Sequence, residues 1–333
     1  MLKAPRSARQ RALILLLTGL ALLTVSIFVG ELRTYQGAQV GVYVIAIASI
    51  VLLTGYSGQI SLGHGAIMAI GGYAAALSFS LWNFPFEVAI VFGVFIGTLG
   101  GFLLGVAAAR LSGPYLAGTT LALAVGLPSL ADQFHILGGE QGLSFDIGDP
   151  PHWVKALGGS DFTQYKWFFW ISVFLALTTL WLITNLLQSS FGRNWRAGRN
   201  NSVAAGLAGI NVARGKVLAF TISSALASLA GALFGVLLGL VTPTAFPLTL
   251  SFSLVTGAVL AGIGNLAGSI LGGVVLVAIP ELSGALATHL GNSQKVTANL
   301  PGLLMSLLLI AVVLFMPNGV RLGKIKKYIK LNK

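Results

Sequence analysis

The sequence predicts an all-α fold, a polytopic bundle of membrane-spanning helices. Of the 333 residues, 56% are apolar and only 8% are charged, whereas soluble globular domains carry roughly 25% charged residues. The mean hydropathy is +0.89, and apolar stretches long enough to cross a bilayer recur along the chain. These observations exclude an ordinary soluble domain and indicate one membrane domain over residues 1–333.

Successive apolar stretches give the predicted spans in order. They lie at about 12–30, 37–54, 64–81, 87–109, 113–131, 166–188, 217–241 and 300–316. The first is similar to a secretory signal, but it is long, lacks an A-x-A-like end and precedes many more spans, so we expect a retained helix. A further stretch at 250–281 is interrupted by GIGNLAG at 262–268 and is divided into two short spans. The total is about ten, and eight to eleven are compatible because a broken segment can be re-entrant.

The distribution of charge predicts the orientation of the bundle. The net charge is +12, and basic residues gather at the N-terminus, at Arg110, in the window 192–216 and in the tail 321–333. All of these fall on one side when ten spans are drawn, whereas the acidic loop 132–165 falls on the other. We therefore expect both termini in the cytoplasm, contact of basic residues with membrane lipid, and no nucleic-acid partner.

The window 192–216 concentrates charge and contains signals for a short helix. Asn201 and Ser202 are good N-caps for a helix that begins at Val203, and Gly209 offers a place for the chain to turn. Basic residues repeat every three positions upstream, and apolar residues recur at helical spacing downstream. The basic set is Arg193, Arg196 and Arg199, and the apolar set is Val203, Leu207 and Ile210. The pattern predicts a cytoplasmic docking helix, and the alternative is a linker whose arginines meet lipid headgroups.

Two glycine-containing stretches are candidates for a substrate pathway. In TGYSGQISLGHG at 54–65, four glycines loosen the helix, and Gln59, Ser61 and His64 supply polar side chains. In RLSGPYLAGTTL at 110–121, Tyr115, Thr119 and Thr120 bring hydroxyls into an apolar span. The alternatives are a simple polar connection for the first and hydroxyls bonded within their own helix for the second.

An intramembrane enzyme would need paired carboxylates, a histidine with an acidic partner or a metal cluster. The acids instead gather in one loop or at span ends, the four histidines show no ligand spacing, and there is no cysteine. We expect no catalytic residue, no metal and no bound cofactor. The string GINVARGK at 209–216 departs from a phosphate-binding loop in its spacing and is followed by Val217, so active transport would need ATP bound by a separate ATPase. An ion-coupled secondary transporter is the alternative class.

Several of these stretches, in order, resemble the permease subunits of branched-chain amino acid ABC importers, particularly the M-type chain. The matching strings are the two quoted above with GGEQGL at 138–143 and AFTISSALASLAGAL at 219–233. AAGLAG at 204–209 resembles the cytoplasmic EAA loop of ABC importer permeases, with Val203 where that family has glutamate. The resemblance covers about residues 37–317, and departures at Pro114 and Leu137 bear on the substrate.

The resemblance implies a permease of the bacterial inner membrane that forms a translocation pathway for branched-chain or related neutral amino acids. It also implies a second, H-type permease chain, two ATP-binding cassette ATPases and an extracytoplasmic substrate-binding protein. A urea or short-chain amide permease is the alternative. The ATPase would couple through Arg196, Arg199, Ala204, Ala205 and Gly209.

Overall fold

The computed structural model describes residues 8–111, 113–145, 150–152, 154–155, 162–289 and 294–315. Among these, eight helical segments are long and apolar enough to cross a membrane, and shorter apolar helices at Leu15–Phe28 and Asn299–Phe315 occupy the first and last predicted spans. The predicted class, a helical polytopic membrane protein, is confirmed; ten spans and the orientation stay predictions. Asp146, Asp149, Asp161 and the basic tail 321–333 lie outside the described residues.

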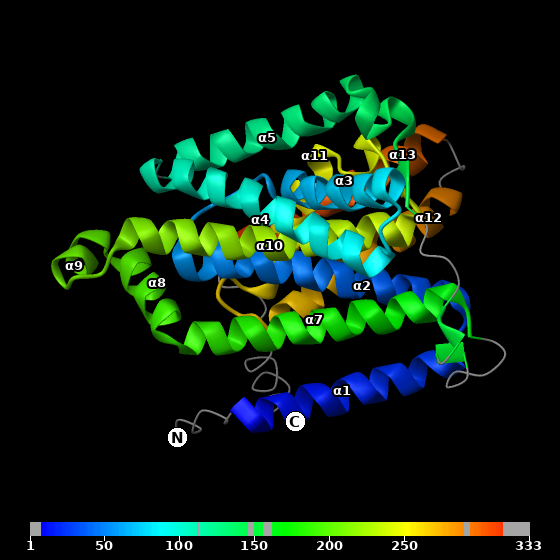
Figure 1. The fold of residues 1–333 in the computed structure, drawn as a ribbon, viewed down its shortest axis with the longest axis horizontal. Helices are drawn as coiled ribbons and strands as arrows, with labels where there is room; N and C mark the ends of the chain where they lie inside the picture. The colour runs from blue at the N-terminus through cyan, green and yellow to red at the C-terminus, as the bar shows by residue number, and fades with distance from the viewer. Residues whose placement is uncertain are drawn as a thin grey trace.

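The longer helices run back and forth between the two ends of the bundle (Figure 1). They are α1 (Ala8–Phe28), α2 (Glu31–Ile50), α3 (His64–Trp82), α4 (Phe86–Arg110), α5 (Pro114–Gln133), α7 (Gln164–Gln188), α10 (Val212–Leu238), α11 (Leu248–Ala261), α12 (Gly268–His289) and α13 (Gln294–Phe315). Two short helices, α8 (Ser190–Asn200) and α9 (Ser202–Leu207), lie between α7 and α10.

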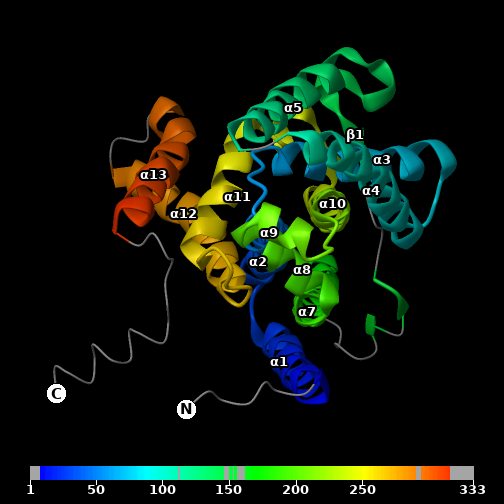
Figure 2. The ribbon, with the colours of Figure 1, turned by 90° about the vertical axis from the view of Figure 1, so that its left-hand side faces the viewer.

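The centre of the bundle is α10, which packs against α2, α3 and α4. α7 lies along α2, with α1 outside it. On the other side of α2 from α7 lie α11 and α12, with α13 beside them (Figure 2). Glycines on α4 let its backbone approach α10 closely: a Cβ added at Gly97 would come within 1.7 Å of Ser228 Oγ, and one at Gly101 within 2.0 Å of Ser224 Cβ. Close packing of small residues is a principal source of helix association where lipid removes the hydrophobic driving force.

The chain leaves helical conformation in two glycine-containing stretches that the sequence analysis singled out, 54–65 and 262–268. The first of these interruptions begins later than predicted. α2 continues without interruption into a π-helical turn, η1 (Val51–Tyr56), so Gly55 is still helical. The chain leaves the helix only at Gly58, whose φ is +75°, and α3 begins at His64. The non-helical residues 58–63 are called the break. A second interruption separates α11 from α12 at residues 262–267, where Gly262 and Gly264 have φ of +87° and +100°.

The end of the bundle opposite α9 contains a small sheet that the sequence analysis missed. α10 stops at Leu238 rather than 241 because Gly239, with φ of +69°, ends the helix. Strands β1 (Leu143–Ser144) and β2 (Leu240–Val241) then pair antiparallel. Short 3₁₀ turns flank them: η2 (His135–Leu137), η3 (Gly139–Gln141) and η4 (Pro243–Ala245).

Candidate functional site

Residues 192–216 are called the coupling segment after the sequence-based prediction, which stays a prediction. They form an elbow that projects from one end of the bundle (Figure 1). α8 can fold back at Gly192 only because no side chain stands there: a Cβ would lie 2.2 Å from the carbonyl oxygen of Leu187. Trp195 anchors α8, since its ring is 4% exposed and its Nε1 donates to the Gly215 carbonyl of α10 at 2.8 Å. The elbow is thereby fixed, and α9 is held beyond the ends of α7 and α10.

α9 has caps at both ends, as the sequence predicts. The Asn201 side chain accepts from two backbone N–H groups of the first turn, at 3.1 and 3.0 Å. At the other end Gly209 has φ of +82°, its N–H donates to Gly206, and the N–H of Ile210 donates to Ala205. This is the Schellman arrangement of helix ends. A helix this short is unstable alone, so the caps fix its shape.

The surface of α9 is apolar and open. Val203 is 72% exposed and Leu207 is 88% exposed, whereas Ala205 points back into the elbow and is 5% exposed. The expectation that Ile210 shares the face of Val203 and Leu207 is wrong, because Ile210 follows the turn and is half-buried. Large apolar side chains at the tip of a projecting helix are typical of a protein contact surface.

The three arginines of α8 are all exposed, as the predicted basic face requires, but their guanidinium groups differ in their partners. Arg193 donates to the Gln188 carbonyl at 3.1 Å, within its own corner of the elbow, and Arg196 is exposed. The guanidinium of Arg199 instead reaches the bundle, where its Nη1 donates to the Gly55 carbonyl in η1. Arg199 therefore contacts the second span, which the sequence spacing alone did not indicate.

The break holds Gln59 and Ser61 in buried positions, 3% and 1% exposed. Gln59 Nε2 donates to Ser57 Oγ at 2.7 Å and to the Lys216 carbonyl, near the start of α10, at 3.0 Å. Its Oε1 is buried without a partner among the described residues. Ser61 Oγ accepts from the N–H of Gly63 at 3.4 Å. These side chains hold the break against the bundle.

His64, the first residue of α3, is 1% exposed and continues this polar cluster. Its Nε2 lies 3.0 Å from Ser223 Oγ, and Ser223 in turn donates to the Ser49 carbonyl at 2.8 Å. Because the Ser223 proton is committed to Ser49, Nε2 is the donor of this pair. Ser49 and Ser223, which the sequence analysis did not single out as partners, join three helices around the break.

Tyr115 and Thr119 lie apart from this cluster. Tyr115 is 76% exposed, and the exposed Thr119 donates to the Tyr115 carbonyl at 2.8 Å. The neighbouring Thr120 is 2% exposed and accepts from the N–H of Leu62 in the break at 2.9 Å. The structure thus brings together Gln59, Ser61, His64 and Thr120, while Tyr115 and Thr119 occupy the outer face of α5.

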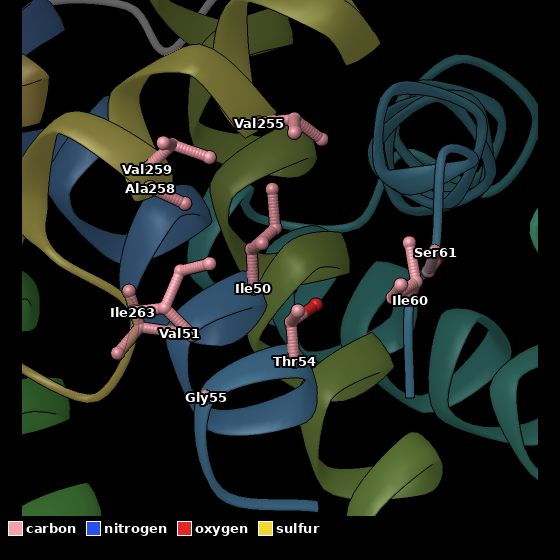
Figure 3. Close-up of a pocket in the computed structure, with 10 residues that line it drawn as sticks. All are labelled: Ile50, Val51, Thr54, Gly55, Ile60, Ser61, Val255, Ala258, Val259 and Ile263. Atoms are coloured by element: carbon pink, nitrogen blue, oxygen red, sulfur yellow. The ribbon is translucent and has the colours of Figure 1, made fainter. Parts of the chain in front are cut away.

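A small cavity lies beside the break. It has a volume of about 30 Å³, enough for one or two water molecules and far below the roughly 300–1,000 Å³ of small-molecule pockets. Its walls come from α2 and η1, from Ile60 and Ser61, and from α11 with its following turn (Figure 3). In this conformation the cavity beside the break is too small for an amino acid.

A larger cleft lies between α11 and α13, with a volume of about 280 Å³. Three of its hydroxyls, on Thr249, Ser253 and Thr256, line one side of α11, and Ser306 of α13 faces them across the cleft. Thr256 and Ser306 donate to carbonyls of their own helices. The sequence analysis did not identify this cleft, because its hydroxyls come together only when α13 packs beside α11.

Comparisons with known proteins find permease proteins of import and transport systems. LivM of Salmonella typhimurium, a high-affinity branched-chain amino acid transport system permease protein, is 32% identical over 72% of this chain and 61% of its own length. LivH of the same organism is 32% identical over 59% of this chain and 55% of its own. The autoinducer 2 import system permease protein LsrC of Salmonella typhi is 27% identical over 79% of this chain and 76% of its own. The chain thus spans about three-fifths of the branched-chain relatives' length.

No solved structure gives a significant match to the chain. The family model described as branched-chain amino acid transport system / permease component matches residues 34–313, from the first turn of α2 to the last turn of α13. It includes the break, the coupling segment and every residue of the polar cluster. Because this match covers most of its length, the chain belongs to the family of branched-chain amino acid transport system permease components.

Proposed function

We propose that the chain is the permease subunit of an ATP-driven importer of branched-chain or related neutral amino acids in a bacterial inner membrane. The observation that carries the proposal is α9, a capped and projecting helix with an exposed apolar surface in a chain of this permease family. The coupling segment contains no phosphate-binding loop. ATP is therefore bound by two partner ATPases, which dock on α9 and the exposed Arg196.

The other partners are assigned to the end opposite α9 and to the outer face of the bundle. A soluble binding protein delivers substrate at the end opposite α9, where η3 and the strand pair lie. A second permease chain, of the H type, covers the face of α5 that carries Tyr115 and Thr119. The two permease chains enclose the pathway, so these hydroxyls face substrate in the assembly although they are exposed in the single chain.

The transport cycle uses the elbow as its moving part. Closure of the ATPases displaces α9, and the break opens or closes the inner end of the pathway. Polar groups of the break form hydrogen bonds to the substrate in place of water, because lipid offers no hydrogen-bond partners.

Uptake into membrane vesicles tests the proposal directly. Vesicles that contain this chain, its partner permease, the ATPases and the binding protein receive labelled leucine or labelled urea, with and without ATP. We expect leucine uptake that requires ATP and is abolished when the ATPase phosphate-binding loop is mutated. Uptake of urea alone would assign the amide class. Uptake driven by an ion gradient without the ATPase would reject the importer and indicate a secondary transporter.

A further inference from the structure

Two side chains connect the coupling segment to the break, one on each side of α9. Upstream of α9, Arg199 donates to the carbonyl of Gly55 in η1, the last turn before the break. Downstream of α9, the Lys216 carbonyl accepts from Gln59 Nε2, inside the break, at 3.0 Å. The part of the chain that contains α9 is therefore attached to the same short stretch of the second span at both of its ends.

The Gly55 carbonyl is a strong acceptor for a cation. It belongs to the last turn of a helix, where carbonyls lack a following helical N–H and carry the negative end of the helix dipole. The fit of Arg199 also depends on the next glycine: a Cβ at Gly58 would lie 2.8 Å from Arg199 Cγ. The stem of the arginine thus packs on the break while its guanidinium closes the helix end.

The contacts continue from the break to the second interrupted span. Tyr56 Oη donates to the Gly264 carbonyl at 2.7 Å, and a Cβ at Gly55 would meet the Gly264 nitrogen at 2.8 Å. The turn between α11 and α12 therefore rests on the residues that Arg199 holds. α8 therefore contacts the first interruption directly, and it is connected to the second through Gly55 and Tyr56.

We propose that Arg199 and Gln59 are positioning residues that transmit the displacement of α9 to the break, rather than contacts for the ATPase. This inference rests on the proposed function. The cavity beside the break holds about 30 Å³, so in the proposed cycle the break moves when substrate passes. These two hydrogen bonds join the coupling segment to residues 55–63. Loss of either leaves docking at α9 intact but separates it from the pathway.

Thiol labelling of the break provides a test that does not depend on transport. The chain has no cysteine, so Ser61→Cys, at a position 1% exposed, introduces the only thiol of this subunit. In the assembled transporter, maleimide labelling of this thiol is measured without nucleotide and with ATP trapped on a hydrolysis-deficient ATPase. We expect the labelling rate to change about tenfold between the two states, within the usual range of coupling between sites.

Variants of the Ser61→Cys chain distinguish transmission of movement from α9 to the break from docking of the ATPase on α9. Arg199→Ala and Gln59→Leu should each abolish most of the ATP-dependent change while the ATPase still copurifies. Arg199→Lys, which keeps a donor for Gly55, should retain part of it. Arg193→Ala is the matched control, since Arg193 lies on the same helix but, among the described residues, donates to Gln188 and not to residues 55–63. It should retain the full change.

Three outcomes would overturn the inference, and one would concern the proposed function instead. The inference fails if Arg199→Ala and Gln59→Leu label like Arg193→Ala, all in the Ser61→Cys chain. It also fails if Arg199→Ala loses the ATPase altogether while Arg193→Ala keeps it, or if a Ser61→Cys transporter that is active in uptake shows no ATP-dependent labelling. Absence of ATP-driven uptake in the unmodified complex would reject the proposed function itself.

Discussion

Two glycines in and beside α9 are expected to respond in opposite directions to the same substitution. Neither has any atom within 4 Å of an added Cβ, so sterics play no part at either position. Gly206 is helical, and Gly206→Ala should stabilise α9 by about 1 kcal/mol. Gly209 has φ of +82°, and Gly209→Ala should destabilise the cap by about 1–2 kcal/mol. Hydrogen exchange of the amides of residues 202–210 should slow in the first variant and accelerate in the second; a change of the same sign in both would contradict the backbone explanation.

Individual residues were predictable from sequence where their role is local. The Asn201 cap and the turn at Gly209 depend only on neighbouring residues, and both are confirmed. The partners of His64 and Arg199 lie far along the chain, at Ser223 and Gly55. Spacing carries no information about such contacts, because they are created by packing of α3 and α8 against other helices.

At the scale of elements, α4 approaches α10 so closely that a methyl group added at their interface should lower the stability of the bundle. Gly97→Ala would place a Cβ 1.7 Å from Ser228 Oγ, so the helices must separate, at a cost of about 1–3 kcal/mol. Gly100→Ala, whose Cβ meets only the end of Ile70 at 3.7 Å, should not lower stability, because the gain in helix propensity meets no steric cost. The midpoint of thermal unfolding in detergent should fall in the first variant only, and Ser228→Gly should partly restore it. Equal midpoints for the two alanine variants would show that α4 and α10 do not pack this closely.

The positions of the long helices were largely predictable, and their ends less so. Apolar length identified α4 to within a residue at each end, and glycines correctly divided α11 from α12. The π-helical turn η1 and the strand pair were missed. Both depend on tertiary contact: Leu240–Val241 becomes a strand only because Leu143–Ser144 lies beside it, and hydropathy cannot distinguish two such residues from the end of an apolar helix.

Across the whole molecule, the folded bundle gathers the described acids at one end and most of the described bases at the other; Arg33, which pairs with Glu281 at 3.3 Å, is an exception. The helix directions place all the acids that the structure describes at the end opposite α9: Glu31, Glu87, Asp132, Glu140 and Glu281. The end that carries α9 has Arg9, Arg110, Arg193, Arg196, Arg199, Arg214 and Lys216. The sequence predicted this separation from loop charges, and the arrangement of helices agrees with it.

This separation predicts which end of the molecule faces the cytoplasm. Basic loops are retained on the cytoplasmic side of a bacterial membrane, so α9 should be inside and η3 outside. In the cysteine-free chain, Gly206→Cys and Glu140→Cys each add one exposed thiol. Expressed without the ATPase, which would shield α9, the Glu140→Cys protein should react with an impermeant maleimide in intact spheroplasts, and Gly206→Cys only after permeabilisation. The reverse pattern would invert the orientation and exclude docking of a cytoplasmic ATPase on α9; labelling of both from outside would contradict the placement of α9 and η3 at opposite ends.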